Sequence, residues 1–139
     1  MKKLIIIRGA SGSGKSTFAK TLASAFKGAG VRVIVVEADD YFYNESGEYN
    51  FDPKQLQDAH NWCQDRAETA MMGGIDVVIV SNTNTSCWEY EPYIEMAKEF
   101  CYSVDCIVKE NLHGGESVHH VGQAVVEKQR DRIRKSLKL

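Results

Sequence analysis

Long apolar segments and a strong charge of either sign are both missing from this sequence. No apolar run approaches the roughly 20 residues that a membrane-spanning helix requires, and the N-terminus lacks the pattern of a secretory signal peptide. The formal net charge is −2, which excludes a generally basic nucleic-acid coat protein but leaves room for a local basic patch. We therefore expect a cytoplasmic protein with no membrane partner.

A metal-binding spacing is missing as well. The cysteines form no C-x-x-C pair, and the histidines do not combine with them into a set of zinc ligands. We therefore predict neither a zinc site nor a disulfide framework, and expect reduced, partly buried thiols. The residues concerned are Cys63, Cys87, Cys101 and Cys106, and His60, His113, His119 and His120.

Residues 9–16 match G-x-x-x-x-G-K-[ST], the pattern of a phosphate-binding P-loop. Its glycines accept backbone angles that other residues resist, so main-chain N–H groups can surround phosphate oxygens. Lys15 is expected to lie against the β- and γ-phosphates, and Ser16 to bind the Mg²⁺ between them. The predicted nucleotide-binding residues are Gly9, Ala10, Ser11, Gly12, Ser13, Gly14, Lys15, Ser16 and Thr17.

The surroundings of this motif favour a true P-loop over a glycine-rich turn that binds nothing. Residues 3–7 are apolar and read as a buried strand, and the helical pattern of residues 17–27 follows directly. The N-terminus of that helix would point its dipole at the bound anion.

Strands and helices alternate along the rest of the chain, which predicts a parallel sheet with helices on both faces. We expect an α/β P-loop NTPase fold of the nucleoside-kinase-like type, with three layers and four or five strands. The 139 residues are expected to form one domain, with a lid at 109–122 and a basic C-terminal helix. The other predicted strands are 31–36, 75–80 and 103–108, and the other predicted helices are 53–72 with Asp52 as N-cap, 88–100 and 121–137.

Motifs of other P-loop classes are absent after residue 16. The chain has no N-K-x-D guanine-reading motif and no D-x-x-G switch element, which argues against a GTPase. It also lacks the length, and the acidic pair after an apolar strand, expected of large ring-forming ATPases. The small kinases remain, in which a P-loop holds the phosphate donor and a basic lid closes over the transferred group.

Asp39 and Asp40 follow the second predicted strand, at the edge of the sheet where α/β proteins bind ligands. A hydroxyl acceptor needs a carboxylate to orient it and take its proton, and Mg²⁺ needs one beside Ser16. On an extended segment the two side chains would point to opposite sides and divide these roles. The alternative is that both serve only the turn.

Three further groups each allow two interpretations. Residues 81–85 either contact the acceptor and metal-bound water or cap the next helix. The basic residues of the last helix, Arg130 among them, supply a lid cation or a solvated face. The aromatic residues at 41, 42, 43, 49 and 51 stack on a nucleobase or form a hydrophobic plug over the sheet edge.

Taken together, the motifs resemble the polynucleotide 5′-hydroxyl kinase group of small P-loop kinases. The resemblance covers nearly the whole chain, and D-D-Y-F followed by N-T-N-T is its most specific part. The matching segments are GASGSGKST at 9–17, ADDYFY at 38–43, GEYNFDP at 47–53, AHNW at 59–62, IVSNTNT at 79–85 with Trp88, and VHHV at 118–121 leading to Arg132.

The resemblance implies ATP as donor, Mg²⁺ as cofactor and phosphoryl transfer to a hydroxyl. It assigns the general base to Asp39, which also lies at the metal, and contacts with the acceptor or metal-bound water to Asn82 and Thr83. It places the lid arginine between Arg130 and Arg132. Asp40 and Phe42 are also expected in the acceptor-binding region. Phe42 stands where these kinases have an arginine that binds the nucleic-acid phosphate. Gly122 likewise replaces a proline.

We therefore predict an ATP-dependent kinase acting on a polynucleotide 5′-hydroxyl, so that nucleic acid is an expected acceptor. A modified nucleobase, a nucleoside or another small molecule are rival acceptors, including an activated sugar as in related toxins. A nucleotide-binding module that transfers nothing is the alternative of another class. The sequence does not indicate an oligomeric state.

Overall fold

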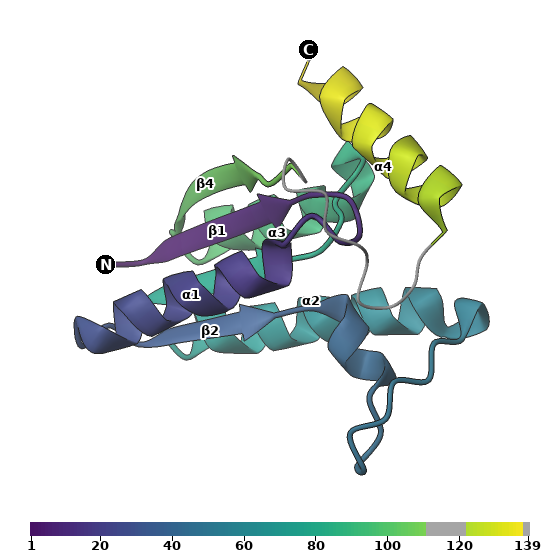
Figure 1. Ribbon diagram of the computed structural model, residues 1–139. Helices are drawn as coiled ribbons and strands as arrows, with labels where there is room; N and C mark the ends of the chain where they lie inside the picture. The colour runs from purple at the N-terminus through teal and green to yellow at the C-terminus, as the bar shows by residue number, and fades with distance from the viewer. Residues whose placement is uncertain (111–121, 138–139) are drawn as a thin grey trace.

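The computed structural model describes residues 1–110 and 122–137. Within them, one sheet of four strands has the order β2-β3-β1-β4, and every neighbouring pair is parallel (Figure 1). The strands are β1 (Lys3–Arg8), β2 (Val33–Val36), β3 (Val77–Ser81) and β4 (Ser103–Val108). The predicted parallel sheet is confirmed, with the smaller of the two expected strand numbers.

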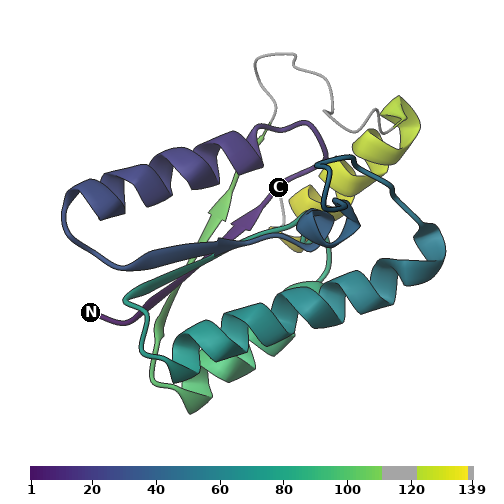
Figure 2. The ribbon, with the colours of Figure 1, turned by 90° about the horizontal axis from the view of Figure 1, so that it is seen from below.

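Helices cover both faces of this sheet. Helix α1 (Lys15–Gly28) lies on one face, and helices α2 (Leu56–Met72) and α3 (Cys87–Glu99) lie together on the other (Figure 2). Helix α4 (Gln123–Ser136) lies beyond the ends toward which the strands point (Figure 1). The predicted three-layer α/β P-loop fold is confirmed.

Alternation along the strands divides the core into two layers. Ile5, Ile7, Val77 and Ile79 pack with Ala19 and Ala23 of α1. Their neighbours in sequence point the other way, because successive side chains of a strand face opposite sides of the sheet. The second layer, under α2 and α3, includes Leu4, Ile6, Val36, Val78, Val80, Ala59, Cys63 and Tyr93. Odd-numbered residues of β1, β2 and β3 therefore face α1, and even-numbered residues face α2 and α3.

Some element ends differ from the predicted ones for local reasons. Strand β2 begins at Val33 because Val31 N–H bonds to the Phe26 carbonyl at 3.0 Å, and Arg32 N–H bonds to Asp76 Oδ2 at 3.0 Å. The predicted cap at Asp52 is confirmed, since its Oδ1 accepts a hydrogen bond from Lys54 N at 3.0 Å. It caps a short 3₁₀ turn, η2 (Pro53–Gln55), that leads into α2.

Residues 111–121 lie outside the described part of the chain. They hold most of the predicted lid at 109–122 and the VHHV segment at 118–121. None of the helices in the described ranges is long and apolar enough to cross a membrane.

Candidate functional site

The P-loop connects the end of β1 to the start of α1, as predicted. Gly12 and Gly14 have φ angles of 80° and 90°, in the left-handed region that favours glycine. Gly14 is the N-cap of α1, so the unpaired N–H groups of the first helical turn point into the loop. This backbone is suited to hold phosphate oxygens.

Gly9 is required by close contacts rather than by its backbone angles. A Cβ atom at this position would lie 2.5 Å from Ser13 Oγ and 2.6 Å from the carbonyl oxygen of Lys109. Its N–H also bonds to the Thr83 carbonyl at 3.2 Å, which fixes the P-loop against the segment that follows β3. Any side chain at position 9 would push these segments apart.

Lys15 lies close to two carboxylates from the end of β2. Burial of this half-buried lysine lowers its pKa, and the charges of Asp39 and Glu37 oppose that shift. The structure thus brings the predicted phosphate-binding lysine together with the predicted base. Glu37, which directly follows β2, joins Lys15 and Asp39 in this group and was not predicted as a site residue.

The backbone at Asp39 and Asp40 is not extended, so the prediction that they point to opposite sides of a strand is wrong. Residues Ala38–Phe42 form a 3₁₀ helix, η1, closed by bonds such as Asp40 N–H to the Glu37 carbonyl at 3.2 Å. A 3₁₀ helix has three residues per turn, so neighbours diverge by about 120°. The two carboxylates still have different surroundings, for that reason.

Asp39 accepts a hydrogen bond from the Tyr49 hydroxyl, with 3.3 Å between Oδ1 and the phenol oxygen. The pKa of Tyr49 is raised by burial and by the charge of Asp39. Burial raises the pKa of Asp40, while the charges of Arg66 and Lys20 lower it. Asp39 therefore faces Lys15 and Tyr49, and Asp40 faces two cations of α1 and α2.

The polar segment after β3 is mostly engaged within the protein. Asn82, which is 7% exposed, accepts the Ala38 N–H at 2.8 Å through Oδ1. Asn84 donates to the carbonyls of Ile7 and Asn82, and Thr85 N–H bonds to Glu89 Oε2 at 2.6 Å. Thr83 alone of residues 81–85 is half-buried rather than buried. Of the two predicted acceptor contacts here, Thr83 is the more accessible.

Phe42 is buried at 5% exposure and does not present its ring at the surface. Its ring packs edge-on against Phe51, with 5.0 Å between the centroids, and against Tyr41 and Tyr49 at 5.4 and 6.1 Å. The interpretation of this segment as a hydrophobic plug therefore fits Phe42. The predicted acceptor contact of Phe42 does not fit this arrangement.

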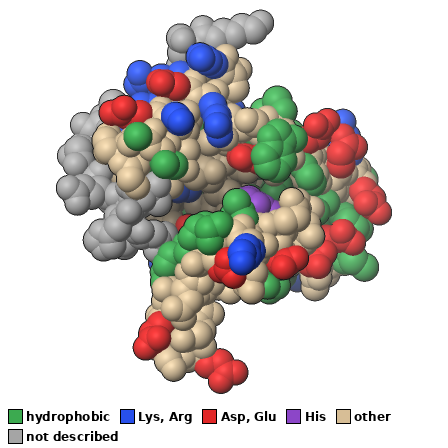
Figure 3. Space-filling model, turned by 90° about the vertical axis from the view of Figure 1, so that its right-hand side faces the viewer, with side chains coloured by type: hydrophobic (Ala, Val, Ile, Leu, Met, Phe, Trp, Pro, Cys, Tyr) green, Lys and Arg blue, Asp and Glu red, His purple; other side chains and the backbone are tan. Residues whose placement is uncertain are grey.

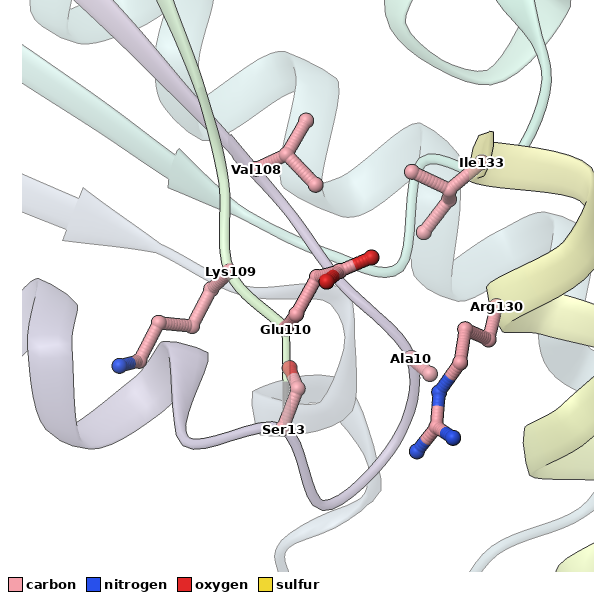
Figure 4. Close-up of a pocket in the computed structure, with 7 residues that line it drawn as sticks. All are labelled: Ala10, Ser13, Val108, Lys109, Glu110, Arg130 and Ile133. Carbon is pink, nitrogen blue, oxygen red and sulfur yellow. The ribbon is translucent and has the colours of Figure 1, made fainter. Parts of the chain in front are cut away.

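Helix α4 touches the P-loop directly. Ser11 N–H donates to Gln129 Oε1 at 2.8 Å, and Arg130 extends beside Ala10 (Figure 4). Arg134 pairs with Glu110, with 2.8 Å between Nε and Oε1. Arg132 is exposed and does not line the small pocket formed by Ala10, Ser13, Val108, Lys109, Glu110, Arg130 and Ile133. Of the two predicted lid arginines, only Arg130 lies at the P-loop.

A buried arginine, Arg8, holds this region together and was not predicted. It is 3% exposed, and it donates from Nε to the Asn84 carbonyl and from Nη2 to Ser136 Oγ, each at 2.8 Å. Its guanidinium also lies 4.7 Å from the centroid of the Tyr90 ring. The sequence signal that could have indicated it is a charged residue directly after the apolar residues of a predicted strand.

The residues described so far gather at one edge of the sheet. Figure 3 faces this edge: Lys and Arg side chains of α4 lie above a hollow, and the loop of residues 43–51 projects below it. Within the described residues, no group of three or more His, Cys, Asp or Glu side chains could hold a metal alone. A metal ion here would need phosphate oxygens as ligands too.

Comparison with known proteins agrees with this description. Residues 4–136 match the family described as "AAA domain". NEDD4-binding protein 2 of Homo sapiens is 40% identical over 101 residues, which cover 73% of this chain and 5% of that protein. The chain thus corresponds to a small part of this relative.

Two solved structures share the fold. A chain of the Pnkp1/Rnl/Hen1 RNA repair complex has a TM-score of 0.74 at 19% identity, over 99% of this chain and 45% of that one. The APS kinase CysC of Mycobacterium tuberculosis, in a mutant form, has a TM-score of 0.62 at 13% identity, over 99% and 98% of the two chains. At these identities the likeness concerns the fold alone.

Proposed function

This chain belongs to the AAA-domain family of P-loop proteins, and we propose that it is an ATP-dependent kinase that phosphorylates a hydroxyl group, first of all a polynucleotide 5′-hydroxyl. The observation that carries the proposal is the position of Asp39. Asp39 follows the end of β2 in η1, where the charge of its carboxylate opposes the lowering of the Lys15 pKa by burial. A module that only binds nucleotide needs the lysine, whereas a kinase also needs a carboxylate that can accept the proton of the acceptor hydroxyl.

The P-loop side of the site holds the donor. The N–H groups of residues 9–16 and the Lys15 ammonium bind the phosphates of ATP, and Ser16 contributes a hydroxyl ligand for Mg²⁺. When bound, Mg²⁺ neutralises charge that develops on the phosphates during transfer. Arg130 lies where it can reach the same phosphates from α4.

The β2 side of the site activates the acceptor. Asp39 accepts the proton of the acceptor hydroxyl as its oxygen attacks the γ-phosphorus. A new phosphorus–oxygen bond forms, the bond to the β-phosphate oxygen breaks, and ADP leaves. The Tyr49 hydroxyl orients Asp39 through the hydrogen bond between them.

Two cations favour an anionic acceptor over a neutral nucleoside. Lys20 and Arg66 both act on the pKa of Asp40, so they lie near the acceptor side of the site. Arg66 also lies over the Trp62 ring, 4.8 Å from its centroid, which limits the freedom of its guanidinium. A polynucleotide brings phosphates that such cations can bind. The structural likeness to a chain of an RNA repair complex is compatible with this acceptor.

The test is transfer of label from γ-labelled ATP. The acceptors are DNA and RNA oligonucleotides with a 5′-hydroxyl, the same oligonucleotides with a 5′-phosphate, and a panel of nucleosides and small alcohols. We expect label on the 5′-hydroxyl oligonucleotides and none on their blocked counterparts. Label on a nucleoside alone would change the acceptor class. ATP binding without label on any acceptor would contradict the kinase proposal.

A further inference from the structure

Glu37 is a buried carboxylate that the proposed donor and acceptor chemistry leaves unused. It follows β2 directly and is 8% exposed. None of the residues that the structure describes forms a hydrogen bond with its Oε1 atom. Burying a carboxylate is unfavourable unless a cation or hydrogen-bond donors compensate its charge. The burial of Glu37 therefore calls for a cation beside it, either the Lys15 ammonium or a bound metal ion.

The register of the sheet shows the direction in which Glu37 points. Val35 pairs with Ile79 and Val36 with Val80, so Glu37 comes level with Ser81. Ile79 packs on the α1 face of the sheet, and the position two residues later lies on the same face. Glu37 keeps an extended backbone, with φ −137° and ψ 133°. Glu37 and Ser81 thus both face α1, which begins with Lys15 and Ser16.

The electrostatics of Lys15 agree with this placement. Burial lowers the pKa of Lys15, and the charges of Asp39 and Glu37 oppose that shift. Ser16 is the next residue of the same helical turn, and its hydroxyl is the expected protein ligand of Mg²⁺ in a P-loop. The unpartnered carboxylate and the expected metal ligand therefore belong to one small region.

Ser81 stands at the end of β3, where an acidic residue is expected. In many P-loop proteins an acidic residue at the end of a neighbouring strand joins the P-loop hydroxyl in holding Mg²⁺. Strand β3 lies next to β1 and ends instead in Ser81, which is 3% exposed. Among the described residues, none hydrogen-bonds its Oγ atom. The chain thus has a hydroxyl where the acid is expected and an acid at the adjacent position of β2.

The donors fit Mg²⁺ rather than a metal held by protein alone. No cluster of three or more metal-binding side chains exists within the described ranges. Mg²⁺ in phosphate-transfer sites needs only one or two carboxylates, because phosphates and water complete its coordination. Ser16, Glu37 and the phosphates of a bound nucleotide provide such a set.

We propose that Glu37 supplies, from β2, the carboxylate on which Mg²⁺ binding depends, in place of the acid that β3 lacks at Ser81. This inference rests on the proposed function only in requiring that the P-loop binds ATP. It assigns to Glu37 a role that is separate from proton transfer by Asp39. The competing explanation is that Glu37 only compensates the charge of Lys15.

Nucleotide binding with and without metal separates these explanations, and needs no acceptor. We would measure ATP affinity by calorimetry in EDTA and in saturating Mg²⁺, for the wild type and Glu37→Gln. The wild type should bind ATP more tightly with Mg²⁺, and in Glu37→Gln this gain should fall by about 10- to 100-fold. In EDTA the variant should bind ATP at least as tightly as the wild type, because one carboxylate no longer repels the phosphates. Glu99→Gln makes the same charge change at an exposed position, the last residue of α3, and should change neither value.

Mn²⁺ gives a direct readout of the metal. Paramagnetic resonance of Mn²⁺ added to the protein with ADP should show weaker binding in Glu37→Gln. Adding Ser81→Asp to that variant should restore it, since the new carboxylate occupies the adjacent position. Ser81→Asp alone should tighten Mn²⁺ binding, and this result does not depend on the folding of Glu37→Gln.

Three outcomes would overturn the proposal. Equal metal dependence in the wild type and Glu37→Gln would leave Glu37 no role toward the ion. A loss of ATP affinity that is the same in EDTA and in Mg²⁺ would show that Glu37 serves only Lys15. A wild type that binds no nucleotide would instead contradict the proposed function, and this inference with it.

Discussion

The two sides of the candidate site are held in place in different ways. On the P-loop side, short-range features set the shape of the backbone: left-handed angles at Gly12 and Gly14, and a helix that begins at Lys15. Longer-range bonds, such as Ser11 N–H to Gln129, then fix the loop in place. On the side formed by the ends of β2 and β3, distant residues hold one another, as in the bond from Ala38 N–H to Asn82 Oδ1 across 44 positions. The backbone shape of the donor side is therefore set locally, whereas that of the acceptor side depends on the packed sheet.

This difference has a functional consequence. A change in the P-loop backbone should act on nucleotide binding, whereas a change at Asp39 or Phe42 should act on turnover or on stability. Four substitutions separate these effects.

Asp39→Asn should reduce phosphoryl transfer by about 10²- to 10⁴-fold and leave ATP affinity nearly unchanged. The substitution keeps the shape of the side chain and removes its ability to accept a proton. Steady-state transfer and calorimetric ATP titration measure the two effects separately. Asp40→Asn is the matched control, and should lose much less activity because Asp40 faces Arg66 and Lys20 instead. An equal loss in both variants would show that Asp39 and Asp40 do not have separate roles.

Phe42→Ala should lower the free energy of unfolding by about 3–5 kcal/mol, because it leaves a cavity under the aromatic cluster. The cavity would lie on the acceptor side, since the P-loop does not pack against this ring. Urea unfolding measures the loss of stability. Phe51→Ala removes a ring that is 50% exposed and should have a clearly smaller effect. An equal loss of stability in Phe51→Ala and Phe42→Ala would show that the exposed ring stabilises the cluster as much as the buried one.

Arg130→Ala should reduce transfer by about 10²- to 10³-fold, as expected when one group that stabilises the transferred charge is lost. Arg132→Ala should have little effect, because Arg132 is exposed and lies outside the pocket at the P-loop. The two variants carry the same loss of charge on the same helix. The ratio of their turnover numbers therefore tests whether position, rather than net charge, determines the effect. A larger loss for Arg132 would reassign the lid cation.

Asp76→Asn should have the smallest effect, because it acts on an exposed ion pair at the opposite edge of the sheet. Hydrogen bonds from Arg32 lower the pKa of Asp76 below its ordinary value of 3.8. A carboxyl whose folded-state pKa is lowered stabilises the fold above its unfolded-state pKa, and this contribution is lost as the pH falls through the folded-state pKa. Melting temperatures should therefore differ slightly at pH 7, and the difference should shrink as the pH falls below 3.8. A difference that grows at low pH would contradict the ion-pair explanation.

The local features of the fold could be predicted from the sequence. The P-loop, the helix that follows it and the cap at Asp52 all depend on residues near one another in the chain. These predictions matched the structure within a few residues. The nucleotide-binding motif was recognisable for the same reason, because the spacing of its glycines, lysine and serine determines the backbone shape of the loop.

The arrangement at the end of β2 could not be predicted in the same way. An extended segment was a reasonable expectation for residues that follow a strand. Instead, Asn82, from the end of β3, fixes the backbone at Ala38, and the chain turns into a 3₁₀ helix there. The burial of Glu37 depends on that same packing. Neither effect leaves a pattern in the surrounding sequence.

Arg8 ties the last helix to the centre of the molecule, and this affects how the protein opens. Its guanidinium joins β1 to the Asn84 carbonyl, to Ser136 at the end of α4 and to the Tyr90 ring. Because these bonds are lost together, α4 should unfold in one step with the adjoining strand ends rather than fray alone. Amide hydrogens of α4 and of the β1 end would then exchange with solvent at similar rates. Helix α4 would thus belong to the same cooperative unit as the phosphate-binding loop.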